Sequence, residues 1–394
     1  MLEPPTLNGD TFPAVNKRAS VLVPPLLSWF DRTARDLPWR RTKDPYAIWI
    51  SEIMLQQTQV KTVIPYWERW MKQLPTVQSL ARARMQTALK LWEGLGYYTR
   101  VRNAQKAAQI IVARHGGVFP RDHAAVLALP GIGRYTAGAI CSIAFSQPAP
   151  ILDGNVTRVL CRVFGIGDDP RERKVNERLW TLAQQLVQAA VSYNSPRLPG
   201  SLSQIRRTPT QQKETKKTKA VASFSSEKNQ ASHLNQSMME LGAVICTPRS
   251  PRCGVCPIQE HCAAFRLDKT EEWPAAAKRP ASVQRRRIAF IVARAGKYLV
   301  QQRPTDAVNA GLWEFPGLEV DQRRDDLPRE CDGFAINDPT PLCRVDHTIT
   351  RYRIRLEAYH AETTTPKTPG RWLTPAELAK LPFTSAHRKI AECL

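Results

Sequence analysis

The 394-residue chain has no long apolar run, and this absence limits what the protein can be. Its most apolar segments, such as 288–293, have the length of a strand and are far too short to cross a bilayer. The first 27 residues contain acidic side chains and prolines but no continuous apolar stretch, which is not the pattern of a secretory leader. We therefore expect a protein with no membrane partner.

Acidic side chains are also scarce relative to basic ones. Lysine and arginine number 57 against 35 aspartates and glutamates, so the formal net charge is +22. An excess of this size indicates a polyanionic partner, most often nucleic acid. One basic tail could produce the same charge, but residues 195–231 hold only eight basic and two acidic side chains. The rest of the chain is therefore basic as well, which favours nucleic acid.

The nine cysteines do not form the even, spread set of a disulfide framework. Four of them crowd into seventeen residues with the spacing C-x6-C-x2-C-x5-C: Cys246, Cys253, Cys256 and Cys262. This distribution predicts a reducing compartment and one metal site. Four thiolates in a short irregular loop can close around one soft metal centre, and the spacing alone fits an iron–sulfur cluster or structural zinc.

Changes in hydrophobic periodicity predict several domains. Apolar residues recur at helical spacing over most of 22–265, which we expect to be an all-α core. The segment 195–231 is rich in Ser, Thr, Gln, Lys and Pro, and it is predicted to be a disordered basic insertion. Residues 1–21 are expected to be a flexible N-terminus and 266–284 an interdomain linker. Residues 285–394 are expected to form a second domain.

The pattern of the second domain predicts strands as well as helices. Apolar residues alternate with polar ones over 352–360, which is typical of a half-buried strand. Thr374, Pro375 and Glu377 have the spacing of a helix start with a capping box. The fold class is therefore multidomain, with an all-α core followed by an α+β domain.

Two carboxylates in the helical region are candidates for catalysis. Glu52 lies in the apolar run 49–55, where a carboxyl group removed from water keeps its proton more readily and can act as a general acid. Asp153 precedes another helix, where it fits either catalysis or an ordinary N-cap. One protonated and one ionised carboxylate is the arrangement that cleaves glycosidic bonds. The more ordinary alternatives for Glu52 are that it faces solvent or that it caps a buried amide.

A glycine turn precedes a helix at residues 129–137. Gly131 and Gly133 let the backbone approach a partner closely, and the helix N-terminus offers free amides to an anion such as a DNA phosphate. Such a contact would position DNA without selecting its sequence. The same turn also describes many helical corners, so alone it is weak evidence.

Taken together, these strings resemble the MutY-type adenine DNA glycosylases, which belong to the helix–hairpin–helix superfamily that includes endonuclease III. The matching segments are 37–40, 51–60, 92–98, 129–139, 152–156 and the cysteine cluster. The resemblance covers about residues 22–265 apart from the insertion, and it extends more weakly to the C-terminus.

The resemblance implies roles for individual residues. Glu52 corresponds to the acid that protonates adenine at N7, and Asp153 to the carboxylate that stabilises the cationic sugar. The other positions match three groups of the family's side chains: Asn155 and Tyr135, which orient the site; Gln57 and Tyr97, which wedge into the duplex where adenine has flipped out; and Trp39, Arg40 and Gln236, which form the adenine pocket. The four clustered cysteines correspond to the ligands of a [4Fe–4S] cluster.

Tyr135 separates two subclasses of the superfamily. The bifunctional relatives of endonuclease III have a lysine nucleophile at this position, whereas a phenol is a poor former of Schiff bases. We therefore expect a monofunctional enzyme that uses water.

The second domain resembles a Nudix domain at 302–304 and 311–317. A Nudix hydrolase needs paired glutamates to hold Mg²⁺, but Arg323 stands at the first such position and the later run is incomplete. The resemblance is instead to the 8-oxoguanine recognition domain of the MutY family. That domain carries Phe-Ser-His where this chain has Ile349, Thr350 and Arg351. Thr350 keeps a hydroxyl, and an ordinary strand on a basic surface is the alternative.

The function expected is excision of adenine opposite 8-oxoguanine or guanine in double-stranded DNA by a monomer. The expected compartment is the cytoplasm or nucleoid of a bacterium, or the nucleus or an organelle of a eukaryote. Two alternatives are a lyase acting on oxidised pyrimidines and an inactive DNA-damage binder. Tyr135 and the C-terminal domain argue against the first alternative, and the pair Glu52 and Asp153 argues against the second.

Overall fold

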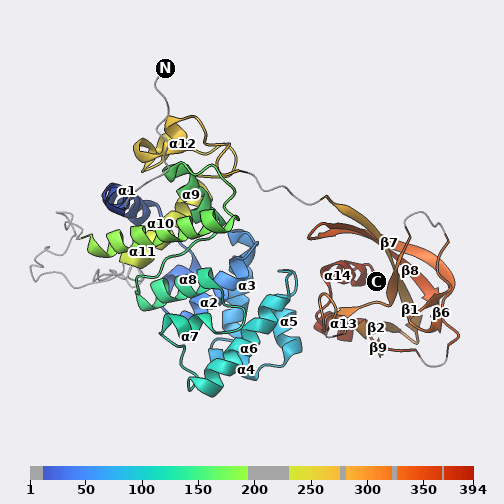
Figure 1. Ribbon diagram of the computed structural model, residues 1–394. Coiled ribbons are helices and arrows are strands. Elements are labelled where there is room, and N and C mark those ends of the chain that lie inside the picture. The colour runs from blue at the N-terminus through green and yellow to red at the C-terminus, as the bar shows by residue number, and fades with distance from the viewer. Residues whose placement is uncertain (1–11, 194–229, 276–280, 305, 322–325, 366–367) are drawn as a thin grey trace, which may run out of the picture. The chain divides into compact units, whose positions relative to one another are not determined.

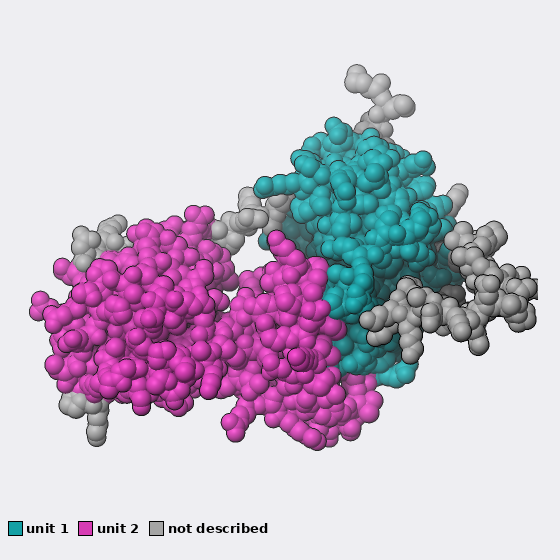
Figure 2. Space-filling view, turned by 180° about the vertical axis from the view of Figure 1, so that it is seen from behind, with its two compact units in different colours: residues 1–49, 121–127, 133–276 teal, residues 50–120, 128–132, 277–394 magenta. Residues whose placement is uncertain are grey.

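A computed structural model describes residues 12–193, 230–275, 281–304, 306–321, 326–365 and 368–394. The chain divides into two compact units (Figure 2), which are described separately below. Residues 1–49, 121–127 and 133–276 form the first unit, and residues 50–120, 128–132 and 277–394 form the second. The predicted disordered insertion 195–231 lies outside the described residues except for its last two, which belong to a helix.

The first unit is helical. Its main elements are α1 (Phe12–Thr33), α8 (Arg134–Phe145), α9 (Gly154–Phe164), α10 (Arg173–Ser192) and α11 (Gln230–Val244). They share one apolar core because each helix repeats apolar residues at three- and four-residue spacing. Since α1 begins at Phe12, the prediction that all of 1–21 is a flexible N-terminus is wrong for residues 12–21.

Short elements complete the first unit. They are η1 (Pro38–Arg41), α7 (His123–Leu127), η2 (Cys253–Val255), η3 (Gln259–His261) and α12 (Ala263–Arg266). The predicted linker 266–284 is also too long. Trp273 packs against Gly167, and its carbonyl accepts a hydrogen bond from Arg162 Nε at 3.0 Å. The first part of that segment is therefore fixed to the helical unit.

The second unit contains a helical part and a sheet. The helices are α2 (Pro45–Leu55), whose first residues belong to the first unit, α3 (Val60–Gln73), α4 (Val77–Arg82), α5 (Met85–Trp92) and α6 (Thr99–Arg114). The rings of Trp70 and Trp92 meet edge to face at 5.6 Å in their core. Gly131 precedes α8 with φ +76°, and a Cβ there would lie 2.6 Å from that of Asn103. This turn therefore requires glycine.

The sheet has the strand order β3-β2-β1-β8-β7, with β4 beside β1 and β9 beside β2. Its strands are β1 (Val283–Arg294), β2 (Lys297–Gln302), β3 (Trp313–Glu314), β4 (Gly317–Val320), β7 (Asn337–Ile349), β8 (Tyr352–Glu362) and β9 (Arg371–Leu373). A hairpin of β5 (Glu330–Cys331) and β6 (Phe334–Ala335) is separate. β1 and β8 run parallel, and the other pairs are antiparallel.

Both faces of the sheet are covered at β1, because successive side chains point to opposite faces and residues 288–292 are all buried. On β1, Ala289 and Ile291 face one core with α13 (Pro375–Lys380) and α14 (Ser385–Ala391), which Figure 1 shows beside the sheet. Ile288 and Phe290 face the other core. The predicted alternation of β8 holds from Ile354 to Ala358 but not at His360, which is exposed. The predicted capping box at Thr374 and Glu377 is confirmed.

The expected fold class, an all-α core followed by an α+β domain, is thus confirmed. None of the helices in the described part of the chain combines the length and apolar character needed to cross a membrane.

Candidate active site and cluster loop

Asp153 begins helix α9 as its N-cap. Its Oδ1 accepts a hydrogen bond from the backbone N–H of Val156 at 2.7 Å, and its Oδ2 accepts one from Asn155 Nδ2 at 3.0 Å. Burial raises the pKa of Asp153 above its usual value, although these hydrogen bonds oppose the shift. The capping alternative considered from the sequence is therefore correct, and the cap also fixes both carboxylate oxygens.

Asn155 continues this network towards the cysteine loop. Its Oδ1 accepts from Arg158 Nη2 at 2.9 Å, and Arg158 Nε donates to the carbonyl of Cys246 at 2.7 Å. Gly242 lies against Asn155, because a Cβ at Gly242 would be 2.6 Å from that of Asn155. Asp153 is therefore connected through two side chains to the backbone of the first clustered cysteine.

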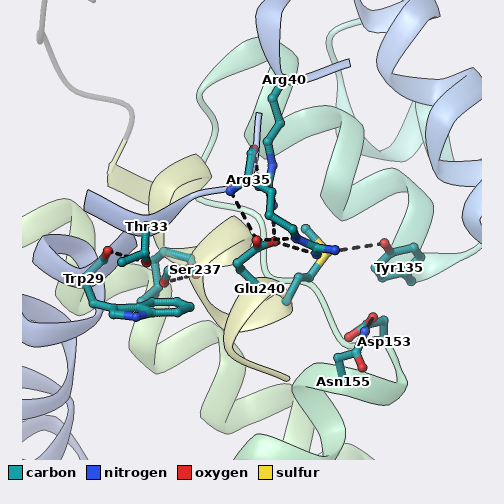
Figure 3. Close-up of polar contacts among 11 residues, drawn as sticks. Trp29, Thr33, Arg35, Arg40, Tyr135, Asp153, Asn155, Ser237 and Glu240 are labelled. Carbon is teal, nitrogen blue, oxygen red and sulfur yellow. Dashed lines mark hydrogen bonds and ion pairs between the residues drawn. The ribbon is translucent and has the colours of Figure 1, made fainter. Parts of the chain in front are cut away.

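Tyr135 lies in the first turn of α8. It is half-buried, and its hydroxyl donates to Met239 Sδ of α11 at 3.5 Å (Figure 3). In the close-up, Asp153 and Asn155 lie below the Tyr135 ring, at the start of α9. The structure therefore brings together three of the predicted catalytic residues within the first unit.

A buried ion-pair network at Glu240 was not predicted from the sequence. The Glu240 side chain is 1 % exposed, and its two oxygens accept from Arg35 Nε at 2.5 Å and Arg40 Nη2 at 2.8 Å. Burial alone would raise the pKa of Glu240, but the two arginines hold it below its usual value. A single Glu in the apolar stretch 238–244 was the only available signal in the sequence.

This network contains one of the residues predicted to form the adenine pocket. Arg40 Nη2 donates to Glu240 Oε2 at 2.8 Å, and Arg40 Nη1 donates to the carbonyl of Arg35 at 3.0 Å. Trp39, on the same short helix, is buried. Gln236 lies one turn before Glu240 on α11, and its amide donates to Ser232 Oγ at 3.0 Å. The ion pair therefore fastens the segment that carries Trp39 to the helix that carries Gln236.

Of the other predicted site residues, the four clustered cysteines and Gly133, the N-cap of α8, belong to the first unit, and the rest belong to the second. Glu52 lies within α2 and is 5 % exposed, so it does not face solvent. Gln57 and Tyr97 lie in turns with φ +58° and +48°, and both are exposed. Thr350 lies at the tip of the β7–β8 hairpin with φ +52°. Positive φ is uncommon for residues with a Cβ, and such residues often gather at functional sites.

The four clustered cysteines line one cavity of the first unit, together with apolar side chains of α9 and α11. All four are free, and Arg162 Nη1 donates to Cys246 Sγ at 3.3 Å. Burial raises the pKa of the Cys256 thiol to about 12, so a bound cationic centre is needed to make it a thiolate ligand.

The donor set bears on which metal centre this site fits. Its four candidate ligands are all cysteine thiols, and they line one cavity. Four thiolates are the ligand set of an iron–sulfur cluster, so the residues present fit that group.

Comparison with known proteins identifies three matching regions. Residues 50–185 match the HhH-GPD superfamily base excision DNA repair protein, and residues 246–262 match the iron–sulfur binding domain of endonuclease III. Residues 288–393 match the NUDIX domain. The first two matches cover the glycine turn before α8, helix α9 and the cysteine loop described above.

Whole-chain relatives extend these matches. Proteins named adenine DNA glycosylase from Rattus norvegicus and Homo sapiens are each 35% identical over 93% of this chain, covering 76% and 72% of their own lengths. A solved thermostable thymine-DNA glycosylase superposes with a TM-score of 0.50 at 27% identity, covering 64% of this chain and 99% of its own.

The matched helical domain and the cluster loop therefore define a base-excision DNA glycosylase, a DNA-binding hydrolase of N-glycosyl bonds with a [4Fe–4S] cluster. Within that class, the chain belongs to the family of adenine DNA glycosylases.

Proposed function

We propose that the enzyme removes adenine paired with 8-oxoguanine or guanine from duplex DNA and leaves the strand uncut. It acts as a monomer in the compartment that holds the DNA. The observation that carries this proposal is the likeness to proteins named adenine DNA glycosylase over 93% of the chain, because it includes the C-terminal domain. The thymine-DNA glycosylase matches only 64% of the chain.

Glu52 is the general acid in this proposal. Its burial in the apolar helix α2 supports a carboxyl group that can hold a proton and deliver it to adenine N7. Protonation lets the base leave as the bond between its N9 and the sugar C1′ breaks. Glu52 then takes a proton from the water that adds to C1′, so the products are free adenine and an abasic sugar.

Asp153 stabilises the positive charge that develops on the sugar. Its two oxygens are fixed by Val156 and Asn155, so the carboxylate need not reorganise when charge appears. Tyr135 orients the same site through Met239. Its phenol forms no Schiff base with the sugar, which supports water as the nucleophile and an uncut strand.

Cys246, Cys253, Cys256 and Cys262 are the proposed ligands of the [4Fe–4S] cluster. When bound, the cluster would supply the cationic iron that these four half-buried cysteines ligate as thiolates, and it would order their loop. The chain's own residues carry the chemistry. Through Arg158, the ordered loop also supports Asn155 and thereby the position of Asp153.

The remaining contacts to DNA are assigned by the family resemblance, and exposure supports those of Gln57, Tyr97 and Thr350. The backbone at Gly131 and Gly133 binds a phosphate beside the start of α8. Gln57 and Tyr97 enter the space that the flipped adenine leaves.

Two further groups bind the bases themselves. Trp39, Arg40 and Gln236 form the pocket for the flipped adenine. In the C-terminal domain, the hydroxyl of Thr350 reads the altered edge of 8-oxoguanine.

The decisive experiment compares duplexes that contain adenine opposite 8-oxoguanine, adenine opposite guanine, thymine opposite guanine, or an oxidised pyrimidine. Abasic sites are measured by alkali cleavage, and strand nicking is measured without alkali. We expect abasic sites at the two adenine pairs and no nicking. Activity only on thymine or oxidised pyrimidines would refute the proposal.

The ligand assignment has its own test. Protein purified without oxygen should be brown and contain about four iron atoms and about four sulfide ions per chain. Cys253→Ser should lower the iron content, whereas the buried but unclustered Cys141→Ser should not. Stoichiometric zinc with a colourless protein would contradict the assignment.

A further inference from the structure

One half-buried arginine, Arg100, holds the two turns that carry Gln57 and Tyr97. Arg100 lies in the first turn of α6, and both of its terminal nitrogens donate to backbone carbonyls. Nη1 donates to Ile53 at 2.6 Å, to Gln56 at 2.8 Å and to Met54 at 3.4 Å. Nη2 donates to Leu95 at 3.0 Å and to Gly96 at 3.1 Å.

The first group of carbonyls ends helix α2. The last carbonyls of a helix have no donor within it, and the negative end of the helix dipole attracts a cation. Ile53 directly follows Glu52, and Gln56 directly precedes Gln57. By binding both carbonyls, Arg100 fixes the turn of Gln57 relative to the helix that carries Glu52.

The second group of carbonyls belongs to the turn before Tyr97. The Gly96 carbonyl also accepts from Trp92 Nε1 at 3.1 Å, so its direction is doubly fixed. The Arg100 guanidinium lies 5.3 Å from the ring centre of Trp92 and 5.6 Å from that of Tyr97. One planar group therefore binds both turns and also contacts the side chain of the second.

The backbone of both turns needs such support. Gln57 and Tyr97 each have positive φ, a conformation that costs free energy for residues with a Cβ and persists only where neighbours enforce it. A lysine could keep the charge but not the fork, because its three donors sit on one nitrogen. Burial also lowers the pKa of Arg100 to about 10, which still leaves it charged near neutrality.

We propose that Arg100 is the positioning residue that holds Gln57 and Tyr97 ready to enter the duplex, in register with Glu52. This inference rests on the proposed function, in which those two side chains replace the extruded base. Arg100 does not touch the base or the sugar. Its contribution is to the step in which the base leaves the stack, before the glycosidic bond breaks.

The test compares two duplexes with the same adenine opposite 8-oxoguanine. In one, all flanking bases are paired; in the other, mismatches on both sides leave the adenine already unstacked. Arg100→Lys should slow single-turnover excision about tenfold or more on the paired duplex and less than about threefold on the unstacked one. Equal slowing on both duplexes would show a general structural role and overturn the inference.

A double variant sharpens the test. If Arg100 acts through the wedge, Arg100→Lys should add little to the loss caused by Tyr97→Ala, because the two changes remove the same function. Losses that simply multiply would contradict this mechanism. Arg114→Lys is the matched control, since Arg114 lies exposed on the same helix, and it should leave both rates unchanged.

A second route covers the case in which Arg100→Lys does not fold. Gly96 has φ +68° and open space around an added Cβ, so Gly96→Ala strains only the turn whose carbonyl Arg100 binds. It should show the same preference for the unstacked duplex, and the inference fails without that preference. If the wild-type enzyme excises another base, the proposed function fails, and the same comparison is made with that base.

Discussion

The start of α9 and the tip of the β7–β8 hairpin carry two parts of the proposed function, and they are held in opposite ways. Asp153 is fixed through Asn155 and Arg158, whose partner Cys246 lies 88 residues further along the chain. Thr350 is exposed, and its hydroxyl donates to the carbonyl of its neighbour Ile349 at 2.7 Å. Arg351 similarly contacts the adjacent Tyr352.

This difference matches two physical demands. A group that stabilises a short-lived charge must already be in place, because reorganising it during the reaction would cost the energy that it is meant to supply. A group that inspects DNA can adjust when the DNA arrives, so local contacts are enough. Variants at the buried site should therefore cause large losses, and variants at the hairpin should cause small, selective ones.

The largest effect is expected from Glu52→Gln, which keeps the shape of the side chain and removes its transferable proton. Single-turnover excision should fall by about 10²- to 10⁴-fold, while binding to the mispaired duplex persists. Glu68→Gln, on the exposed face of α3, is the control and should change neither quantity. Near-normal excision by Glu52→Gln would mean that another residue is the acid.

The next effect concerns the stability of the helical unit. Glu240→Gln removes the counter-charge of Arg40, whose side chain is largely buried. Arg35 is partly exposed, so solvent screens its interaction with Glu240 and this ion pair contributes less. We expect a loss of about 2–4 kcal/mol in the free energy of unfolding, measured by urea titration. Asp36→Asn, which removes an exposed ion pair with Arg41, should have no comparable effect. Similar losses for both variants would remove the distinction between buried and exposed pairs.

A smaller and more selective effect is expected at the hairpin. Thr350→Val keeps the branched shape and removes the hydroxyl, so the preference for 8-oxoguanine over guanine opposite adenine should weaken. A good polar contact to a base edge is worth about 1–3 kcal/mol, and we expect a change towards the lower end. The measurement is the ratio of single-turnover rates on the two duplexes, with the exposed Thr340→Val as control. An unchanged ratio for Thr350→Val would place lesion recognition elsewhere.

The smallest effect, counted per pH unit, is expected in the pH dependence of the stability of the C-terminal domain. His387 is buried and accepts from the Phe315 N–H at 3.0 Å, and burial, helped by the nearby Arg287 and Arg303, lowers its pKa to about 3. Because the folded pKa lies below the unfolded one, the stability it gives is present above about pH 6.5 and is lost as pH falls towards 3.

The slope of this dependence gives the test. Each pH unit below about 6.5 should cost up to about 1.4 kcal/mol of the free energy of unfolding. His387→Asn keeps an acceptor and has no titrating group, so its stability should fall less steeply, while exposed His360→Asn should follow the wild type. Parallel curves for His387→Asn and the wild type would show that His387 is not responsible for the slope. The Glu314 carboxylate, 3.7 Å from His387 Nε2, favours the protonated imidazole and therefore opposes the effect of burial.

The sequence predicted the features that depend on neighbours along the chain. Helical and strand periodicity identified the two fold classes, and the Thr374 capping box formed as expected. The cysteine spacing located the cluster loop, which the comparisons support. The roles of individual site residues remain predictions, and the end of the N-terminal segment was misplaced because α1 begins at Phe12.

What the sequence determined by itself is therefore local: caps, glycine turns, alternation and closely spaced ligands, whose free energy comes from residues a few positions apart. Only the tertiary structure decided which arginines neutralise Glu240, how Arg158 joins Asp153 to the cysteine loop, and that Arg100 binds the turns of both Gln57 and Tyr97. Glu240 and Arg35 are 205 positions apart, Arg158 and Cys246 are 88 apart, and Arg100 and Gln56 are 44 apart, whereas Arg100 and Gly96 are only four apart. Packing of whole helices brings such partners together, and no periodicity along the chain records it.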